Sequence, residues 1–181
     1  MNKNSLFVGL GNPDKKYEKN RHNIGRNFII FLAKEWNSSD WENNKKCFAE
    51  ISCINEEARK IILAKPLVFM NNSGKSINQL KKFYNISLKN IFIAQDDADI
   101  NLGDFKISYD RGSAGHNGIK STIDHLKSKA FYRIRIGIRP FFKTRKKAED
   151  FVLKNFTLQE NKILEKLFPI IEEEVNNKMK N

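Results

Sequence analysis

Polar residues that could carry out acid–base chemistry stand close to three apolar segments of this sequence. Asn12 follows the apolar run Leu6–Leu10, Asp96 follows the run 90–94, and His22 directly precedes an amphipathic helical pattern. A histidine paired with a carboxylate is a common general base, because the acid orients the ring and stabilises its cation. Asparagine side chains both donate and accept hydrogen bonds, which suits the binding of peptide groups and the stabilisation of an oxyanion. Such a set predicts a hydrolase.

Other chemistries are less well supported by the same residues. No serine or cysteine stands at a sharp strand-to-helix turn of the nucleophile-elbow kind, so water is the expected nucleophile. The stretch Gln95-Asp96-Asp97-Ala98-Asp99 could instead hold a metal ion, but no group of histidine ligands accompanies it, and we predict none. Val8-Gly9-Leu10-Gly11 begins like a dinucleotide-binding motif, yet Asp14 stands where the third glycine is needed. The alternative interpretation of His22 is structural: it would be only a residue at the start of a helix, with no part in catalysis.

Length and composition indicate one globular domain over residues 1–181, with 40% hydrophobic and 11% aromatic residues. No run of about 18 apolar residues occurs, so we expect no membrane span. The apolar segment near the first residue is too short for a signal peptide, which predicts a cytoplasmic protein. Cys47 and Cys53 are expected to be buried thiols, because two cysteines with this spacing indicate neither a zinc site nor a disulfide framework.

The charge of the chain points to a polyanionic partner. There are 33 basic and 21 acidic residues, a formal net charge of +12. Residues 127–147 hold nine Lys or Arg and no Asp or Glu, with Phe131, Tyr132, Phe141 and Phe142 between them. This pattern favours contact with a nucleic-acid backbone over a merely solvated face.

Apolar runs and helical patterns alternate along the chain. A hairpin is expected around residues 55–57, Asn72 or Ser73 is a natural N-cap, and Pro169 should kink or split the last helix. Residues 36–46 and the acidic stretch 95–99 are expected to be irregular. The predicted strands are 6–10, 47–54, 60–65, 90–94, 105–109 and 131–138, and the predicted helices span about 24–36, 73–84, 117–126, 143–154 and 157–179.

This alternation predicts an α/β fold, a single-domain three-layer sandwich with a mainly parallel mixed sheet and helices on both faces. Ligands of such folds bind beyond the carboxyl ends of the strands. Asn12, Asn71, Asp96 and the pair His116-Asn117 come just after strands or at the helix starts that follow them. His22 precedes the first helix on the same side. We therefore expect these side chains to meet at one edge of the sheet.

The order of short motifs resembles that of the bacterial peptidyl-tRNA hydrolase family. The resemblance runs from Val8 to about Phe156, and the last twenty-five residues match mainly as a helical pattern. The motifs are Val8-Gly-Leu-Gly-Asn-Pro, Tyr17, Arg21-His-Asn-Ile-Gly25, Phe69-Met-Asn, Ser73-Gly-Lys75, Asp96-Asp-Ala-Asp99, Gly115-His-Asn-Gly-Ile-Lys120, Arg133-Ile-Arg-Ile-Gly137 and Phe151-Val-Leu153.

The resemblance implies hydrolysis of the ester between a peptide and the 3′ end of tRNA, which recycles the tRNA. It implies that His22 is the general base that activates water and that Asp96 orients it. Asn12 would distinguish peptidyl-tRNA from aminoacyl-tRNA, and Asn71 would hold the substrate near the scissile ester. Asn117 would hold the peptide backbone.

The resemblance also bears on residues outside the proposed catalytic group. Tyr17 and Phe69 would line the path of the tRNA end or the peptide. Lys106 and Arg135 are candidates for contacts with tRNA phosphates, and the Lys143–Lys147 cluster for general steering. His116 is expected to be structural, His125 has no expected role, and Gln95 replaces a histidine that many relatives carry.

The implied partner is peptidyl-tRNA, bound through the tRNA acceptor end, and a monomer without a cofactor is expected. The competing class is a catalytically silent RNA-binding homologue, because a plant organellar splicing factor shares this fold and serves RNA processing without hydrolysis. His22, Asp96, Asn12 and Asn71 are all present here, which favours the enzyme.

Overall fold

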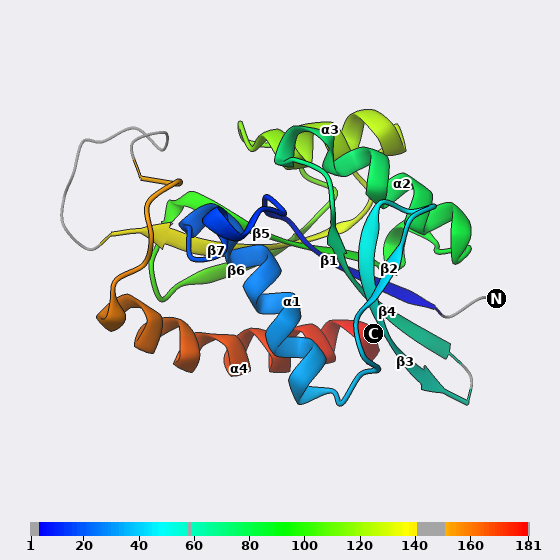
Figure 1. Ribbon diagram of the computed structural model, residues 1–181, viewed down its shortest axis with the longest axis horizontal. Coiled ribbons are helices and arrows are strands. Elements are labelled where there is room, and N and C mark those ends of the chain that lie inside the picture. Colours follow the sequence, from blue (N-terminus) through cyan, green and yellow to red (C-terminus); the bar gives the residue numbers. More distant parts are fainter. Residues whose placement is uncertain (1–3, 58, 141–150, 181) are drawn as a thin grey trace.

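The computed structural model describes residues 4–57, 59–140 and 151–180. Its strands form one sheet in the order β2-β3-β4-β1-β5-β7-β6 (Figure 1). The four central strands are parallel, and they are β4 (Arg59–Pro66), β1 (Ser5–Gly9), β5 (Ile91–Asn101) and β7 (Tyr132–Arg139). Antiparallel strands extend both edges, namely β2 (Glu42–Asn44), β3 (Ala49–Glu56) and β6 (Phe105–Tyr109).

Helices cover both faces of this sheet. Helices α1 (Ile24–Glu35) and α4 (Leu158–Lys180) lie on one face, while α2 (Ser73–Phe83) and α3 (Asn117–Leu126) lie side by side on the other (Figure 1). Short 3-10 turns precede several strands and helices, and they are η1 (Lys15–Tyr17), η2 (Arg21–Asn23), η3 (Met70–Asn72) and η4 (Leu88–Asn90). The predicted α/β fold with helices on both faces of a mixed sheet is confirmed.

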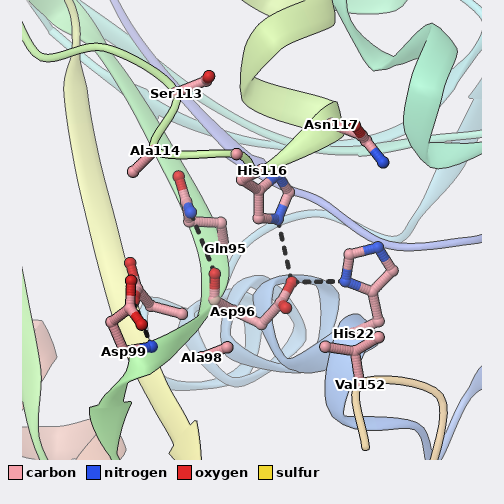
Figure 2. A pocket seen from close by; sticks show the side chains of 12 residues that line it. His22, Gln95, Asp96, Ala98, Asp99, Ser113, Ala114, His116, Asn117 and Val152 are labelled. Carbon is pink, nitrogen blue, oxygen red and sulfur yellow. Dashed lines mark hydrogen bonds and ion pairs between the residues drawn. The ribbon is translucent and has the colours of Figure 1, made fainter. Parts of the chain in front are cut away.

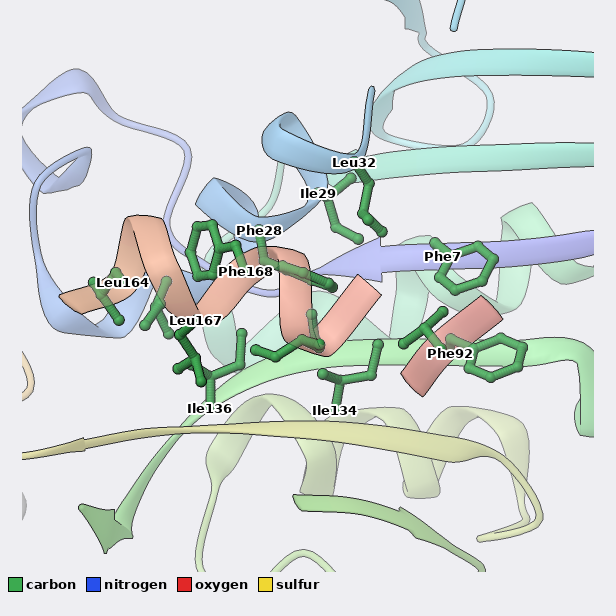
Figure 3. Close-up of a cluster of buried hydrophobic side chains, with 14 of the residues drawn as sticks. Phe7, Phe28, Ile29, Leu32, Phe92, Ile134, Ile136, Leu164, Leu167 and Phe168 are labelled. Carbon is green, nitrogen blue, oxygen red and sulfur yellow. The ribbon is translucent and has the colours of Figure 1, made fainter. Parts of the chain in front are cut away.

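Each face of the sheet has its own hydrophobic core, because successive side chains of a strand point to opposite faces. Phe7 packs with Phe92 and with residues of α1 and α4 (Figure 3). Its neighbours Leu6 and Val8 pack on the opposite face with α2 and α3. Ile134 and Ile136 share the α1–α4 face with Ile138, as the alternation in β7 predicts.

Two glycines let α1 approach the sheet closely enough to place the residues before it. A Cβ atom on Gly25 would lie 2.2 Å from the carbonyl oxygen of Ala94, and one on Gly9 would lie 2.5 Å from the carbonyl oxygen of Gly25. Only glycine permits such an approach, since real Cβ atoms essentially never come under 3.0 Å. The start of α1 is therefore held against β1 and β5, directly beside Asp96.

Two stretches expected to be irregular form strands. Residues 42–44 pair with β3 as a short edge strand, and polar edge strands of three residues carry little periodicity to detect. Strand β5 continues through the acidic stretch to Asn101, with Gln95 opposite Arg135 and Asp97 opposite Gly137 in β7. The polar residues stay in the strand because β7 supplies cations beside them, and Arg135 Nε lies 2.7 Å from Asp97 Oδ2.

The end of the chain also differs from expectation. Pro169 lies inside one continuous helix, so the predicted split is wrong. Proline removes one helical hydrogen bond, but Phe168 and Ile171 on either side of it are buried against the sheet and hold the helix together. Most of the predicted helix 143–154 lies outside the described residues, and residues 151–154 form turns. Within the described part of the chain, no helix is both long and apolar enough to cross a bilayer.

Candidate active site

Three side chains from distant parts of the chain meet beside the parallel strands. Asp96 comes from β5 and is 3% exposed, His22 comes from the turn η2 before α1, and His116 is the N-cap of α3 (Figure 2). Each position follows from local structure: the close approach of Gly25 sets η2 against β5, and the loop after β6 returns to begin α3 above the same strand. The structure brings His22 and Asp96 together.

A single oxygen atom joins the three groups. Asp96 Oδ1 lies 2.8 Å from Nδ1 of His22 and 3.0 Å from Nε2 of His116. An ionised carboxylate only accepts hydrogen bonds, so both ring nitrogens donate to it. The second nitrogen of His22 lies on the far side of its ring from Asp96 (Figure 2). That nitrogen is then an acceptor in the neutral ring.

The charges of this cluster stabilise one another. Burial alone would raise the pKa of Asp96, but the charge and hydrogen bond of His116 and those of His22 hold it well below its usual range. Burial alone would lower the pKa of His22, yet the hydrogen bond and the negative charge of Asp96 raise it above 6.5. Asp96 is therefore a carboxylate at neutral pH, and it makes His22 a stronger base.

His22 lies between two cavities. The first has a volume of about 290 Å³ and is lined by residues 95–99 of β5, by the loop 113–117 and by Val152. The second has a volume of about 440 Å³ and is lined by Asn12, Phe69, Met70, Asn71, Val152 and Leu153. His22 and Val152 line both cavities. A substrate whose reacting bond lies at His22 could extend into either side.

Asn12 connects the loop after β1 to the wall of the second cavity. Its backbone N–H donates to Asn23 Oδ1 at 2.8 Å, and Asn23 Nδ2 donates to its carbonyl oxygen at 2.9 Å. Its side-chain oxygen accepts a hydrogen bond of 3.0 Å from the backbone N–H of Met70. Asn12 thereby positions the turn η3, which carries Asn71 into the same cavity.

Some of the other predicted site residues line these two cavities, and others do not. Asn117 lines the first cavity, and Phe69, which is 54% exposed, lines the second. Tyr17 belongs to neither lining and contacts Lys16, whose Nζ lies 4.8 Å from the ring centroid. Arg135 is paired with Asp97, which itself lines the first cavity.

Two residues at this site were not identified as functional from the sequence. His116 was expected to be structural, and its Nδ1 does accept from the N–H of Ile119 at 3.3 Å, but its Nε2 also contacts Asp96. Val152 stands out in the sequence only as part of the motif Phe151-Val-Leu153, although it lines both cavities. The Gly115-His-Asn-Gly sequence at a helix start was the available signal for His116; nothing local indicated the place of Val152.

Donor atoms of the kind that bind transition metals occur in this cluster. One ligand atom each from His22, Asp96 and His116 lie within 4.8 Å of one another. Two imidazoles and one carboxylate suit Zn²⁺ or Fe²⁺ by ligand type. However, the short contacts to Asp96 Oδ1 are those of hydrogen bonds and already use both ring nitrogens that face it.

A histidine in contact with a buried carboxylate beside two cavities, on a mixed α/β sheet, is the arrangement of an enzyme that uses acid–base chemistry. Residues 6–181 match the family model described as Peptidyl-tRNA hydrolase, and the chain belongs to this family. It is 44% identical over 176 residues to the peptidyl-tRNA hydrolase of Bacillus cytotoxicus, covering 94% of this chain and 92% of that one.

Two further comparisons agree with this family. The peptidyl-tRNA hydrolase of Mycoplasma mycoides is 40% identical over 163 residues, with 90% of this chain and 86% of that protein covered. The crystal structure of the peptidyl-tRNA hydrolase from Acinetobacter baumannii superposes with a TM-score of 0.84 at 30% identity, covering 99% of this chain and 94% of that one. Both the sequence and the fold thus place the chain among enzymes.

Proposed function

We propose that this enzyme hydrolyses the ester bond between a peptide and the 3′-terminal ribose of tRNA, with His22 as the general base. The observation that carries the assignment to His22 is its 2.8 Å contact with the buried carboxylate of Asp96, at the point where the two cavities meet. A silent RNA-binding homologue is not favoured, since that role requires no imidazole and carboxylate in contact beside a cavity.

The proposed reaction begins with water beside the free nitrogen of His22. That nitrogen takes a proton from the water as the water oxygen attacks the ester carbonyl carbon, and Asp96 stabilises the resulting imidazolium. The tetrahedral intermediate collapses by breaking the bond to the ribose 3′ oxygen, which receives the proton from His22. The products are a peptide with a free carboxyl group and a tRNA with a free terminal hydroxyl.

Asparagine side chains around His22 supply the polar contacts. Asn71 projects from η3 into the second cavity, where its amide could hold the substrate near the scissile ester and donate to the developing oxyanion. Asn12 places that turn through its bond to the Met70 amide. It would help to distinguish peptidyl-tRNA from aminoacyl-tRNA. Asn117 would hold the peptide backbone in the first cavity.

The remaining partner contacts are proposals of the same kind. Phe69 offers an exposed aromatic side chain at the second cavity for the tRNA end or the peptide. Tyr17, which lines neither cavity, would contact the same part of the substrate outside them. Lys106 and Arg135 are neighbours across β6 and β7 and would attract tRNA phosphates. We also propose that the enzyme acts as a monomer, and that it acts in the cytoplasm, where translation supplies its substrate.

Replacing His22 by alanine tests the base. We expect kcat for hydrolysis of N-blocked aminoacyl-tRNA to fall by on the order of 10²- to 10⁴-fold, the contribution of a lost acid–base group, with the Kd for tRNA little changed. His125→Ala is the matched control, because that ring lies outside both cavities and bonds only to the Ser121 carbonyl oxygen among the described residues. Equal losses of binding and rate in His22→Ala would contradict the base role.

A further inference from the structure

Arg21, the residue directly before the proposed base, makes a largely buried ion pair with Glu160 in α4. One nitrogen, Nη2, lies 2.8 Å from Oε1 and 2.7 Å from Oε2 of Glu160, and the two side chains are 7% and 14% exposed. The guanidinium also donates from Nη1 to the Ile138 carbonyl oxygen at 3.4 Å and stacks on the ring of Phe156 at 4.8 Å. Arg21 thus joins η2 to β7 and to the start of α4.

The chain segment 152–156 runs alongside the segment that carries His22. The His22 N–H donates to the carbonyl oxygen of Val152 at 2.9 Å, and the Arg21 N–H donates to that of Lys154 at 3.0 Å. Asn20 and Asn155 form an antiparallel bridge. These bonds set Val152 and Leu153 beside His22 as a wall of the second cavity.

Glu160 also determines where α4 begins. Its Oε2 accepts from the N–H of Thr157 at 2.8 Å, and its own N–H donates to Thr157 Oγ1 at 3.2 Å, which is a reciprocal capping arrangement. The carboxylate that receives Arg21 is therefore fixed by the helix start. The segment 152–156 is held between two fixed points, η2 at one side and the first turn of α4 at the other.

A contribution to stability alone explains this pair poorly. Burying two charges costs desolvation, which the attraction between them often only balances. Arg21 Nε is in addition buried without a hydrogen-bond partner in the described part of the chain. A pair of apolar side chains would fill the same space without that cost. Apolar contacts are not directional, however, so they would not fix the orientation of η2 relative to α4 as these hydrogen bonds do.

We propose that Arg21 and Glu160 are positioning residues, which set the spacing between the His22 imidazole and the Val152–Leu153 wall and so align the ester with the base. The proposal rests on His22 acting as that base. Arg21 does not touch substrate; it acts through the backbone of η2 and the segment 152–156. The pair therefore contributes to kcat more than to the binding of tRNA.

The test is the double variant Arg21→Met/Glu160→Met, which removes both charges together and leaves no unpaired ion. We expect cooperative folding to be retained and kcat to fall by roughly 10- to 100-fold, since a displacement of about 1 Å can cost 10²-fold. KM should change less than kcat, and the pH at which His22 titrates, followed by NMR of its ring protons, should move. Arg59→Met/Glu56→Met, which removes an exposed ion pair in the β3–β4 hairpin, is the matched control.

Repeating the double change in a variant that lacks the proposed base shows whether the Arg21–Glu160 pair acts through His22. When the same double change is made in His22→Ala, we expect no further loss of kcat, because the group being positioned is gone. Wild-type kcat and an unchanged His22 titration in the double variant would overturn the proposal, as would the same loss in both backgrounds. If His22→Ala itself keeps wild-type kcat, the proposed base is wrong. Should the double variant not fold, Arg21→Gln/Glu160→Gln, which also removes both charges but keeps an acceptor for the Thr157 N–H, is compared in the same two backgrounds.

Discussion

At the scale of single residues, Asp96 controls the protonation of the proposed base. Burial lowers the pKa of His22, but the Asp96 carboxylate more than offsets this, so the imidazolium loses its proton at a higher pH than that of an ordinary histidine does. A base must be neutral to accept a proton. We therefore expect kcat/KM of the wild-type enzyme to rise with pH through the raised pKa of His22 and to level off above it.

Asp96→Asn should change both the height and the position of that profile. Asparagine has the shape of aspartate but carries no negative charge, so it cannot stabilise the His22 imidazolium. The plateau of kcat/KM at high pH should therefore fall by roughly 10²-fold or more. With burial as the remaining influence, the pKa of His22 falls and the rising limb moves to lower pH. The measurement is kcat/KM from pH 5 to 9; a wild-type profile in this variant would remove Asp96 from the site.

His116 shows how much of this site the residue types alone could reveal. The histidine, the carboxylate and the asparagines were identifiable because their chemistry is specific and because they follow strands. The role of His116 beside Asp96 was not, since a histidine that only caps a helix and one that also donates a hydrogen bond to a carboxylate have the same local sequence. Its Nδ1 serves the helix and its Nε2 serves the carboxylate, and only the packing of α3 over β5 brings them together.

At the scale of elements, helices α2 and α3 pack closely through a glycine. A Cβ atom on Gly74 would lie 2.0 Å from the carbonyl oxygen of Ser121, and the Gly74 N–H donates to Ser121 Oγ at 3.1 Å. Gly74→Ala should therefore push the helices apart and lower the free energy of unfolding by about 1–3 kcal/mol, the usual cost of overpacking. Asn71 lies just before α2 and Asn117 is the first residue of α3, so kcat/KM should fall too.

The control for that variant is Gly112→Ala, since a Cβ atom there would meet nothing within 4 Å. Urea unfolding of both variants gives the comparison. An alanine at position 74 with wild-type stability would mean that the two helices can separate without cost.

The end of α3 offers a change in the opposite direction. Lys127 follows the last helical residue with φ 53° and ψ 31°, the left-handed region that favours glycine. Lys127→Gly should remove this backbone strain and raise the free energy of unfolding by about 0.5–1 kcal/mol. Thermal unfolding checks it, with Lys129→Gly as a control outside that conformation; an equal or lower Tm for Lys127→Gly would contradict the expectation.

At the scale of the whole molecule, positive charge is unevenly distributed. Residues 58–95 contain seven Lys or Arg and no Asp or Glu, and three of these lysines are in α2. Helix α4, on the opposite face of the sheet, contains five glutamates and four lysines (Figure 1). A polyanion such as tRNA is therefore attracted more strongly toward one side of the molecule.

The basic stretch 127–147 extends beyond the described residues, so its contribution has to be measured. We expect Lys146→Glu/Lys147→Glu to weaken tRNA binding mainly at low salt and to reduce the slope of log K against log salt by about 1–2, since each phosphate contact contributes about 0.9. Lys178→Glu/Lys180→Glu at the end of α4 is the control with the same change of charge. Equal slopes in the two variants would indicate that residues 146 and 147 are simply solvated.

The sequence by itself determined the succession of strands and helices, the α/β class and the residue types of the site. These depend on periodicity, on turn residues and on side-chain chemistry within short stretches of chain. The tertiary structure decided the rest: that β5 continues through its acids, that His116 shares Asp96 with His22, and that Val152 forms a wall of both cavities. These features join residues 20 to 130 positions apart, and such contacts follow from how the elements pack, which no local pattern encodes.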